Sequence, residues 1–169
     1  MTTLEIEIKL MRYFNIRQNL IVPNVKDIIV GGKVMHECDL LMLSSSGYVT
    51  EFEIKISKND LLKDQNKRHN HDHNWITSLY FAVPNELREI ALEVIPERAG
   101  LYVLSKTTMA WGGEKISIEQ AKKAIRRTPA IKWDFKDRFQ LARLGTMRIL
   151  GLKEKLNQQR LVNNGKTSN

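Results

Sequence analysis

The sequence has a single cysteine, Cys38, in 169 residues, and it has no long hydrophobic run. One thiol cannot form an internal disulfide, so a disulfide-rich scaffold and a four-cysteine zinc site are both excluded. No segment reaches the roughly eighteen apolar residues that a membrane span needs, and the acidic start MTTLEIEIKL is unlike a signal peptide. We therefore expect a soluble, cytoplasmic protein with no membrane partner.

Internal repeats and low-complexity segments are also lacking, and the chain length fits one domain. A chain of this size can bury enough surface to fold without disulfides or a structural metal. We expect one domain over residues 1–162, made of a core over 1–105 and a basic helical extension over 106–162. Residues 163–169, NNGKTSN, have the composition of a frayed tail.

Positive charge is concentrated in the C-terminal part of the chain. Residues 1–105 contain 12 basic and 14 acidic side chains, whereas residues 106–169 contain 15 and 5. A basic tract suits the phosphate backbone of a nucleic acid, although a solvated helical face would have the same composition. The expected DNA-binding residues are Lys67, Arg68, His69, Lys122, Lys123, Arg126 and Arg127, and the tract continues through Lys132, Lys136, Arg138, Arg143 and Arg148.

The hydrophobic pattern predicts an α/β fold in which helices flank a central mixed β-sheet. The expected strands cover residues 20–23, 27–30, 39–43, 48–56, 76–83 and 100–104. The expected helices cover residues 3–15, 58–68, 86–95, 117–127 and 133–158, the last interrupted at Gly145 and Gly151.

Three charged residues fall on two adjacent strands of the predicted hairpin. Asp39 opens the apolar strand DLLML, while Glu53 and Lys55 share one face of the strand over 48–56 with Glu51. Two carboxylates on a rigid sheet can hold a hard divalent cation, and an ammonium beside them can orient or help to ionise the attacking water. This pattern is typical of metal-dependent phosphodiester hydrolysis. The alternative is the ordinary solvent face of an edge strand.

Glu7 is a further candidate for the same site. Residues 3–15 alternate like a strand, but the stripe of Leu4, Ile8, Met11 and Phe14 continues further, which favours a helix. Glu7 then lies within the apolar stripe, where a carboxylate is costly unless it is paired or binds a metal. A simple ion pair with a lysine at the edge of the core is the alternative.

Histidines and tryptophans leave further alternatives open. The segment from His69 to His73 holds three histidines and one aspartate, which fits either a zinc site or a basic loop that touches phosphate at the mouth of the site. The tryptophans can stack on bases or pack in the core, and Trp111, in the loop-like segment MAWGGEK, is the one that we expect to be exposed.

Taken together, these residues resemble the PD-(D/E)XK nuclease superfamily. The strings HECDLLML, GYVTEFEIKISKNDLLKD, LYFAVP and VIPERAGLYVL are similar to its bacterial and phage branch, related to MmcB-type DNA repair proteins, over roughly residues 36–105. The Pro that usually precedes the aspartate is Cys38 here. The resemblance implies a restriction-endonuclease-like or resolvase-like core, Mg²⁺ as cofactor with Mn²⁺ as a substitute, and DNA as partner. It also implies metal ligands at Asp39, Glu53 and Glu7, and a catalytic lysine at Lys55.

The function expected from the sequence is a metal-dependent DNA nuclease that is structure-selective and acts in DNA repair, recombination or phage DNA processing. A catalytically silent DNA-binding or repair-partner protein on the same fold is the first alternative, and a basic interaction domain unrelated to nucleic acid is the second. The nuclease is favoured over the silent protein because degenerate nucleases often lose one of the residues that match Asp39, Glu53 and Lys55. The preferred DNA structure, the mode of cutting and the choice between monomer and homodimer are left open.

Overall fold

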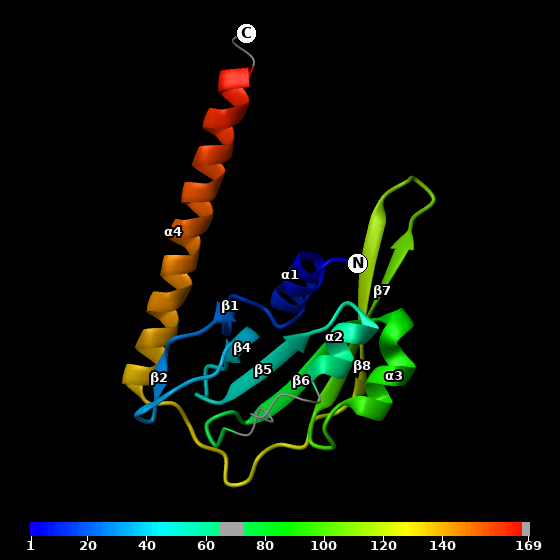
Figure 1. Cartoon of the computed structure of the whole chain (residues 1–169). Coiled ribbons are helices and arrows are strands. Elements are labelled where there is room, and N and C mark those ends of the chain that lie inside the picture. The colour runs from blue at the N-terminus through cyan, green and yellow to red at the C-terminus, as the bar shows by residue number, and fades with distance from the viewer. Residues whose placement is uncertain (65–72, 167–169) are drawn as a thin grey trace.

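The computed structural model describes residues 1–64 and 73–166, and its centre is a six-stranded sheet (Figure 1). The strands lie in the order β1-β4-β5-β6-β7-β8. The two middle pairings, β5 with β6 and β6 with β7, are parallel and the other three are antiparallel, so the predicted α/β class with a mixed sheet is confirmed. The strands are β1 (Leu20–Val25), β4 (Cys38–Leu43), β5 (Val49–Ile54), β6 (Ser78–Pro84), β7 (Gly100–Thr108) and β8 (Glu114–Lys122), and a separate hairpin is formed by β2 (Ile29–Val30) and β3 (Lys33–Val34).

Helices cover both faces of the sheet. On one face, α1 (Thr3–Tyr13) packs its buried Ile6 and Leu10 into a cluster with Phe52 of β5. On the other face, α2 (Lys58–Asp64) and α3 (Arg88–Val94) pack over β6 and β7, and a short turn of 3₁₀-helix, η1 (Asn85–Leu87), leads into α3. The first half of α4 (Phe135–Lys166) covers the β1 edge of that same face. None of the described helices is long and apolar enough to cross a membrane.

The predicted helix at the N-terminus is present, but its predicted apolar stripe is only half right, because Met11 and Phe14 pack against the buried cluster and the other two residues do not. Leu4 and Ile8 are exposed, whereas Ile6 and Leu10 are completely buried. The cap explains where the helix begins, because Thr2 and Glu5 form reciprocal hydrogen bonds across the first turn. The buried face is set by contact with the sheet and not by the longest run of apolar residues.

The predicted helix over residues 117–127 is also wrong, because this segment contains most of β8. Ser117 pairs with Ser105, and Ile118 pairs with Leu104 on β7. Ile116 and Ile118 alternate along β8 and pack against the cluster beneath α1. The open edge of β7 offers backbone hydrogen-bond partners to residues 114–122, and this tertiary pairing outweighs a weak helical preference.

The C-terminal helix runs without interruption through Gly145 and Gly151 and continues to Lys166. It therefore extends into the segment predicted as a frayed tail, of which residues 167–169 lie outside the described chain. Close packing explains the glycine at position 145, because a Cβ atom there would lie 3.3 Å from a methyl group of Val22. Figure 1 shows that the second half of α4 extends away from the sheet.

Candidate active site

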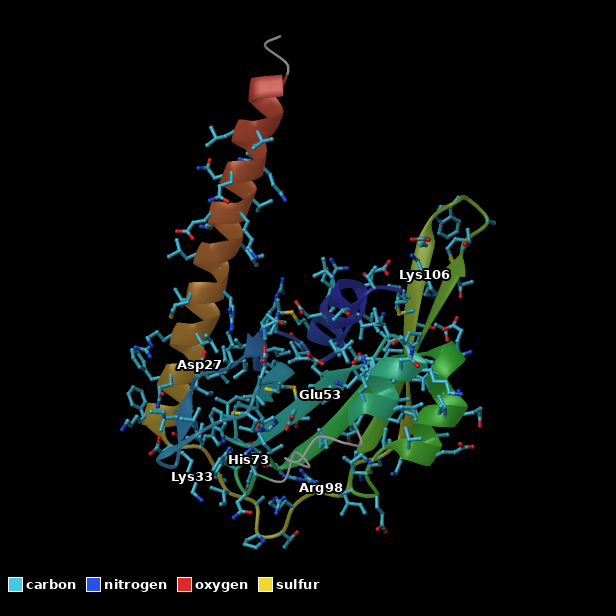
Figure 2. The ribbon with its side chains drawn as sticks, viewed as in Figure 1. Asp27, Lys33, Glu53, His73, Arg98 and Lys106 are labelled. Atoms are coloured by element: carbon cyan, nitrogen blue, oxygen red, sulfur yellow. The ribbon has the colours of Figure 1, made fainter. Side chains whose placement is uncertain are left out.

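The charged side chains of β5 are buried in the middle of the molecule. Strand β5 is the third of six strands, and the relative exposures of Glu51, Glu53 and Lys55 are 0%, 2% and 4%. Figure 2 shows Glu53 at the centre of the fold. The alternative, in which these residues form the solvent face of an edge strand, is therefore excluded.

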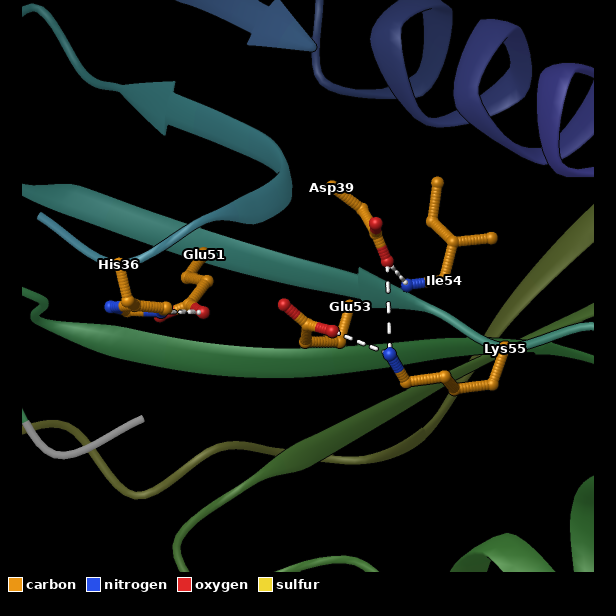
Figure 3. Close-up of polar contacts among 6 residues, drawn as sticks. All are labelled: His36, Asp39, Glu51, Glu53, Ile54 and Lys55. Carbon is orange, nitrogen blue, oxygen red and sulfur yellow. Dashed lines mark hydrogen bonds and ion pairs between the residues drawn. The ribbon is translucent and has the colours of Figure 1, made fainter. Parts of the chain in front are cut away.

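Asp39, Glu53 and Lys55 converge at the end of the β4–β5 hairpin (Figure 3). The Lys55 ammonium lies 2.6 Å from Glu53 Oε2 and 3.9 Å from Asp39 Oδ2. The Asp39 carboxylate also accepts a hydrogen bond from the backbone N–H of Ile54, at 2.8 Å. The last residue pair of the β4–β5 ladder is Leu40 with Phe52. The bond from Ile54 lies just beyond this pair, so the Asp39 side chain links the two strands where their backbone pairing ends.

Backbone pairing fixes Lys55 as well as Asp39. The backbone N–H of Lys55 donates to the carbonyl of Ala82 on β6, at 3.1 Å, so this residue stays attached to the sheet just after β5 ends. Positions on rigid strands hold side chains more precisely than loops do. The three predicted residues are thus brought together by the hairpin and by the parallel neighbour of β5.

Burial raises the pKa of Glu53 from 4.5 to about 7. The Lys55 ammonium opposes this shift, while the negative charges of Asp39 and Glu51 add to it. Glu53 therefore changes its charge near neutral pH when no other cation is present. A site in which several buried carboxylates repel one another is one that a divalent cation stabilises.

Glu7 lies on α1 near Asp39 and is half-buried. Burial raises its pKa, and the negative charge of Asp39 raises it further. Within residues 1–64 and 73–166, Glu7 has no ion pair with a lysine or arginine, in contrast to Glu5, which binds Lys106 at 2.9 Å. The inward position of Glu7 was thus predicted from a stripe of which Leu4 and Ile8 are exposed, and the alternative, an ion pair with a lysine, is not observed among these residues.

The three predicted metal ligands do not form a compact cluster. Among the described residues, no three Asp, Glu, His or Cys side chains lie close enough together to hold a metal ion. Asp39 and Glu53 approach each other through the Lys55 ammonium that lies between them. Carboxylate oxygens are the ligands that Mg²⁺ and Mn²⁺ prefer, so Asp39 and Glu53 have the chemistry to hold a divalent cation, and Glu7 lies near Asp39.

A second buried pair, which the sequence did not reveal, extends the polar row along β5. His36 Nε2 and Glu51 Oε1 are 2.6 Å apart, and the ring of His36 stacks on that of His73 with centroids 4.6 Å apart. His73 in turn stacks on Trp75, at 5.0 Å. The sequence placed Glu51 on the same strand face as Glu53, and this was the one sequence feature that pointed to Glu51. Its partner His36 comes from the segment before β4 and shows no pattern of its own.

The histidine segment is only partly described. Lys67, Arg68 and His69, predicted to bind DNA, lie outside the described residues, as do His71 and Asp72. His73 is described, and its ring contacts are aromatic stacking contacts with His36 and Trp75.

The predicted DNA-binding cations near the end of β8 do not surround Lys55. The Arg127 backbone donates to the Thr77 carbonyl, and its guanidinium lies 3.3 Å from Asn74, so Arg127 lies where β6 begins. Arg126 lies over the ring of Tyr48, at 5.2 Å, just before β5. Glu53 and Lys55 lie at the opposite end of β5. Lys122, at the end of β8, donates to the Pro96 carbonyl, while Lys123 is exposed.

Two of the tryptophans differ in burial. Trp133 is buried and donates from Nε1 to the carbonyl of Trp75, at 3.1 Å. Trp111 is exposed at the turn between β7 and β8, as its sequence context predicted. The β7–β8 hairpin, marked by Lys106 in Figure 2, projects from the body of the protein.

Comparison with known proteins supports the fold and gives no information about the chemistry. No protein-family model and no curated protein matches this chain. One similar solved structure is the SPO1766 protein of unknown function from Silicibacter pomeroyi, with a TM-score of 0.57 and 16% identity over 89% of this chain and 88% of that chain. At this level of identity, the similarity supports a shared α/β fold alone.

The raised pKa of Glu53 predicts a pH-dependent stability difference. A carboxyl whose pKa is higher in the folded state stabilises the protein fully below about pH 4.5 and loses that contribution as the pH rises through about 7. Urea unfolding of the wild type and Glu53→Gln, without metal, should therefore show a relative loss in the wild type on the order of 1 to 3 kcal/mol across this interval. Parallel pH profiles for the two proteins would contradict the raised pKa, and exposed Glu154→Gln is the matched control.

Proposed function

We propose that this protein is a metal-dependent DNA nuclease that hydrolyses phosphodiester bonds. The observation that carries the proposal is the convergence of the buried Glu53 and Lys55 with the partly exposed Asp39, on backbones that the sheet holds in place. Burial of the Glu53 carboxylate and the Lys55 ammonium has a large desolvation cost, and such clusters are typical of functional sites. The resemblance to PD-(D/E)XK nucleases over residues 36–105 assigns the same three residues to catalysis.

Each side chain has a role that follows from its place. Asp39 and Glu53 would hold Mg²⁺ or Mn²⁺, with Glu7 beside Asp39 to orient a water molecule. A bound divalent cation neutralises the phosphate and lowers the pKa of bound water. The Lys55 ammonium would stabilise the extra negative charge of the pentavalent transition state, and its contact with Glu53 would have to give way for that carboxylate to hold a metal.

The proposed substrate is DNA, bound mainly through its phosphates. The chain has a net charge of +8, and the excess lies after residue 105. Backbone-dominated binding of this type is sensitive to salt and insensitive to sequence, which suits an enzyme that selects a DNA structure. Action in DNA repair, recombination or phage DNA processing is part of this proposal.

A catalytically silent DNA-binding protein on the same fold is the second candidate. It is favoured by one observation, the 2.6 Å contact between Lys55 and Glu53, in which the ammonium holds the carboxylate that would bind metal. A permanent ion pair of this kind would be structural. The two candidates differ in whether a divalent cation can displace Lys55 from Glu53.

The test of the proposal is cleavage of defined DNA substrates. Purified protein would be incubated with labelled duplex, single-stranded, flapped and four-way-junction DNA, in Mg²⁺, in Mn²⁺ and in chelator. The proposal expects metal-dependent products from at least one substrate. Binding to these substrates without products in either metal would favour the silent protein instead.

Metal binding also predicts a thermal shift that does not depend on activity. Mn²⁺ at saturating concentration and pH 7.5 should raise the melting temperature of the wild type by about 3 °C or more, because a ligand that binds only the folded state stabilises it. Asp39→Asn should lose this shift, whereas Glu154→Gln, at an exposed and remote position, should keep it. An equal shift in wild type and Asp39→Asn would place the metal elsewhere.

A further inference from the structure

The outer half of α4 carries an exposed apolar stripe made of Ile149, Leu152 and Leu156. These side chains are 57%, 60% and 56% exposed. They continue the helix face that Leu141 and Gly145 use to pack against the sheet, since the spacing from Gly145 onward is four, three and four residues. The stripe therefore begins where the sheet beneath the helix ends (Figure 1).

Nothing in the described chain covers this stripe. The principal contacts of α4 are with β1 and β2, and every residue from Leu152 to Val162 is exposed. A helix segment of this length is only marginally stable in water when it packs against nothing, and Gly151 weakens it further. The large apolar side chains exposed along this continuous helix could be buried by a partner helix.

The spacing of the stripe is that of a coiled-coil seam. With Ile149 and Leu156 at the first position of successive heptads, Leu152 takes the fourth, which is the second core position. Of the positions that flank such a seam, Lys153, Lys155 and Arg160 carry positive charge and Val162 is apolar, while the next second-core position is Gln159. The one acidic residue of this segment, Glu154, lies on the opposite side of the helix, and none of the three cations has an acidic residue three or four positions away.

The positive charges beside the seam distinguish between two kinds of partner helix, a second copy of α4 and an acidic helix. In a second copy of this chain, the flanking positions of two identical helices would place lysines and arginine opposite one another, in parallel or antiparallel pairing. Like charges across a seam oppose that pairing. A helix with an apolar seam and glutamate or aspartate at its flanks would complement both features.

We propose that the outer half of α4 is a docking site for an acidic amphipathic helix of a partner protein. The stripe of Ile149, Leu152 and Leu156 would be buried in a two-helix seam, and Lys153, Lys155 and Arg160 would pair with carboxylates of the partner. This proposal does not depend on the proposed nuclease activity, because the stripe lies on an element that contributes no residue to the Asp39 site.

The test uses the full-length protein and a designed peptide. The probe is a labelled 21-residue helix with leucine and isoleucine at the seam and glutamate at the flanks, and binding is measured by fluorescence anisotropy at physiological salt. Two control peptides are a scramble of the same composition and a version with lysine at the flanks. The proposal expects micromolar binding of the acidic helix and at least tenfold weaker binding of both controls.

Paired variants separate the stripe from the helix as a whole. Leu152→Asp should weaken binding of the acidic helix at least tenfold. Leu150→Asp is the matched control, because Leu150 is equally exposed but lies outside the seam, and it should leave binding unchanged. Circular dichroism of both variants checks that α4 is retained to the same extent.

Four results would overturn the proposal. They are no binding of the acidic helix, equal binding of the scramble, self-association in light scattering that Leu152→Asp abolishes, and binding to phosphatidylserine vesicles that requires Leu152. The third would assign the stripe to a second copy of the chain, and the fourth to a membrane surface.

Discussion

Replacing Lys55 by Met should reduce DNA cleavage by about 10²-fold to 10³-fold or more, because the ammonium that stabilises the transition-state charge is removed. Asp39→Asn should have an effect at least as large, since it removes a proposed metal ligand and weakens the acceptor of the Ile54 N–H. Both are measured as single-turnover rates on the best substrate of the panel. DNA affinity, measured without metal, should stay within a few-fold of the wild type.

Two exposed substitutions are controls for these variants. Lys33→Met removes a cation from the β2–β3 hairpin, and Glu154→Gln removes a carboxylate from α4, so neither should change the cleavage rate. Loss of cleavage in Lys33→Met equal to that in Lys55→Met would show that overall charge and not the site is responsible. Unchanged cleavage rates in both Asp39→Asn and Lys55→Met would refute the assignment of these residues to the active site.

Phe52→Ala should lower the free energy of unfolding by about 3 to 5 kcal/mol. Phe52 is completely buried on the face of β5 opposite Glu53, and its ring lies 4.9 Å from Phe14 and 5.9 Å from Tyr80, centroid to centroid. Truncation would leave a cavity between α1 and the sheet. The measurement is urea unfolding at pH 7, followed by circular dichroism.

Phe135→Ala is the matched control for Phe52→Ala. The Phe135 side chain is 82% exposed at the start of α4, so its truncation should change stability by no more than about 0.5 kcal/mol. Similar losses in the two variants would mean that the cluster beneath α1 is not a stabilising core.

The β4–β5 hairpin and its charged face were predictable because a local pattern encodes them. Alternation over residues 48–56 placed Glu53 and Lys55 on one face, and Asp39 at the head of an apolar strand was an evident exception to packing. The sequence could not show that this face is buried. Burial depends on segments that are distant in the sequence, and for Glu51 one of these is the segment before β4 that carries His36.

Features that depend on distant partners were missed or predicted for the wrong reason. The segment at 117–127 was expected to be helical, and it became β8 because β7 offered an unpaired edge. His36 meets Glu51 only after the chain has turned through β4 and β5. Glu7 was placed inward by a stripe of which Leu4 and Ile8 are exposed in the structure, and its real neighbour is Asp39.

The most direct test of the site is the position of Mn²⁺ in crystals of the protein, located by anomalous diffraction. We expect a peak coordinated by the carboxylates of Asp39 and Glu53, with the Lys55 ammonium moved away from Glu53. A structure in which Lys55 keeps its contact with Glu53 at saturating Mn²⁺, and in which Asp39 and Glu53 bind no ion, would contradict this expectation.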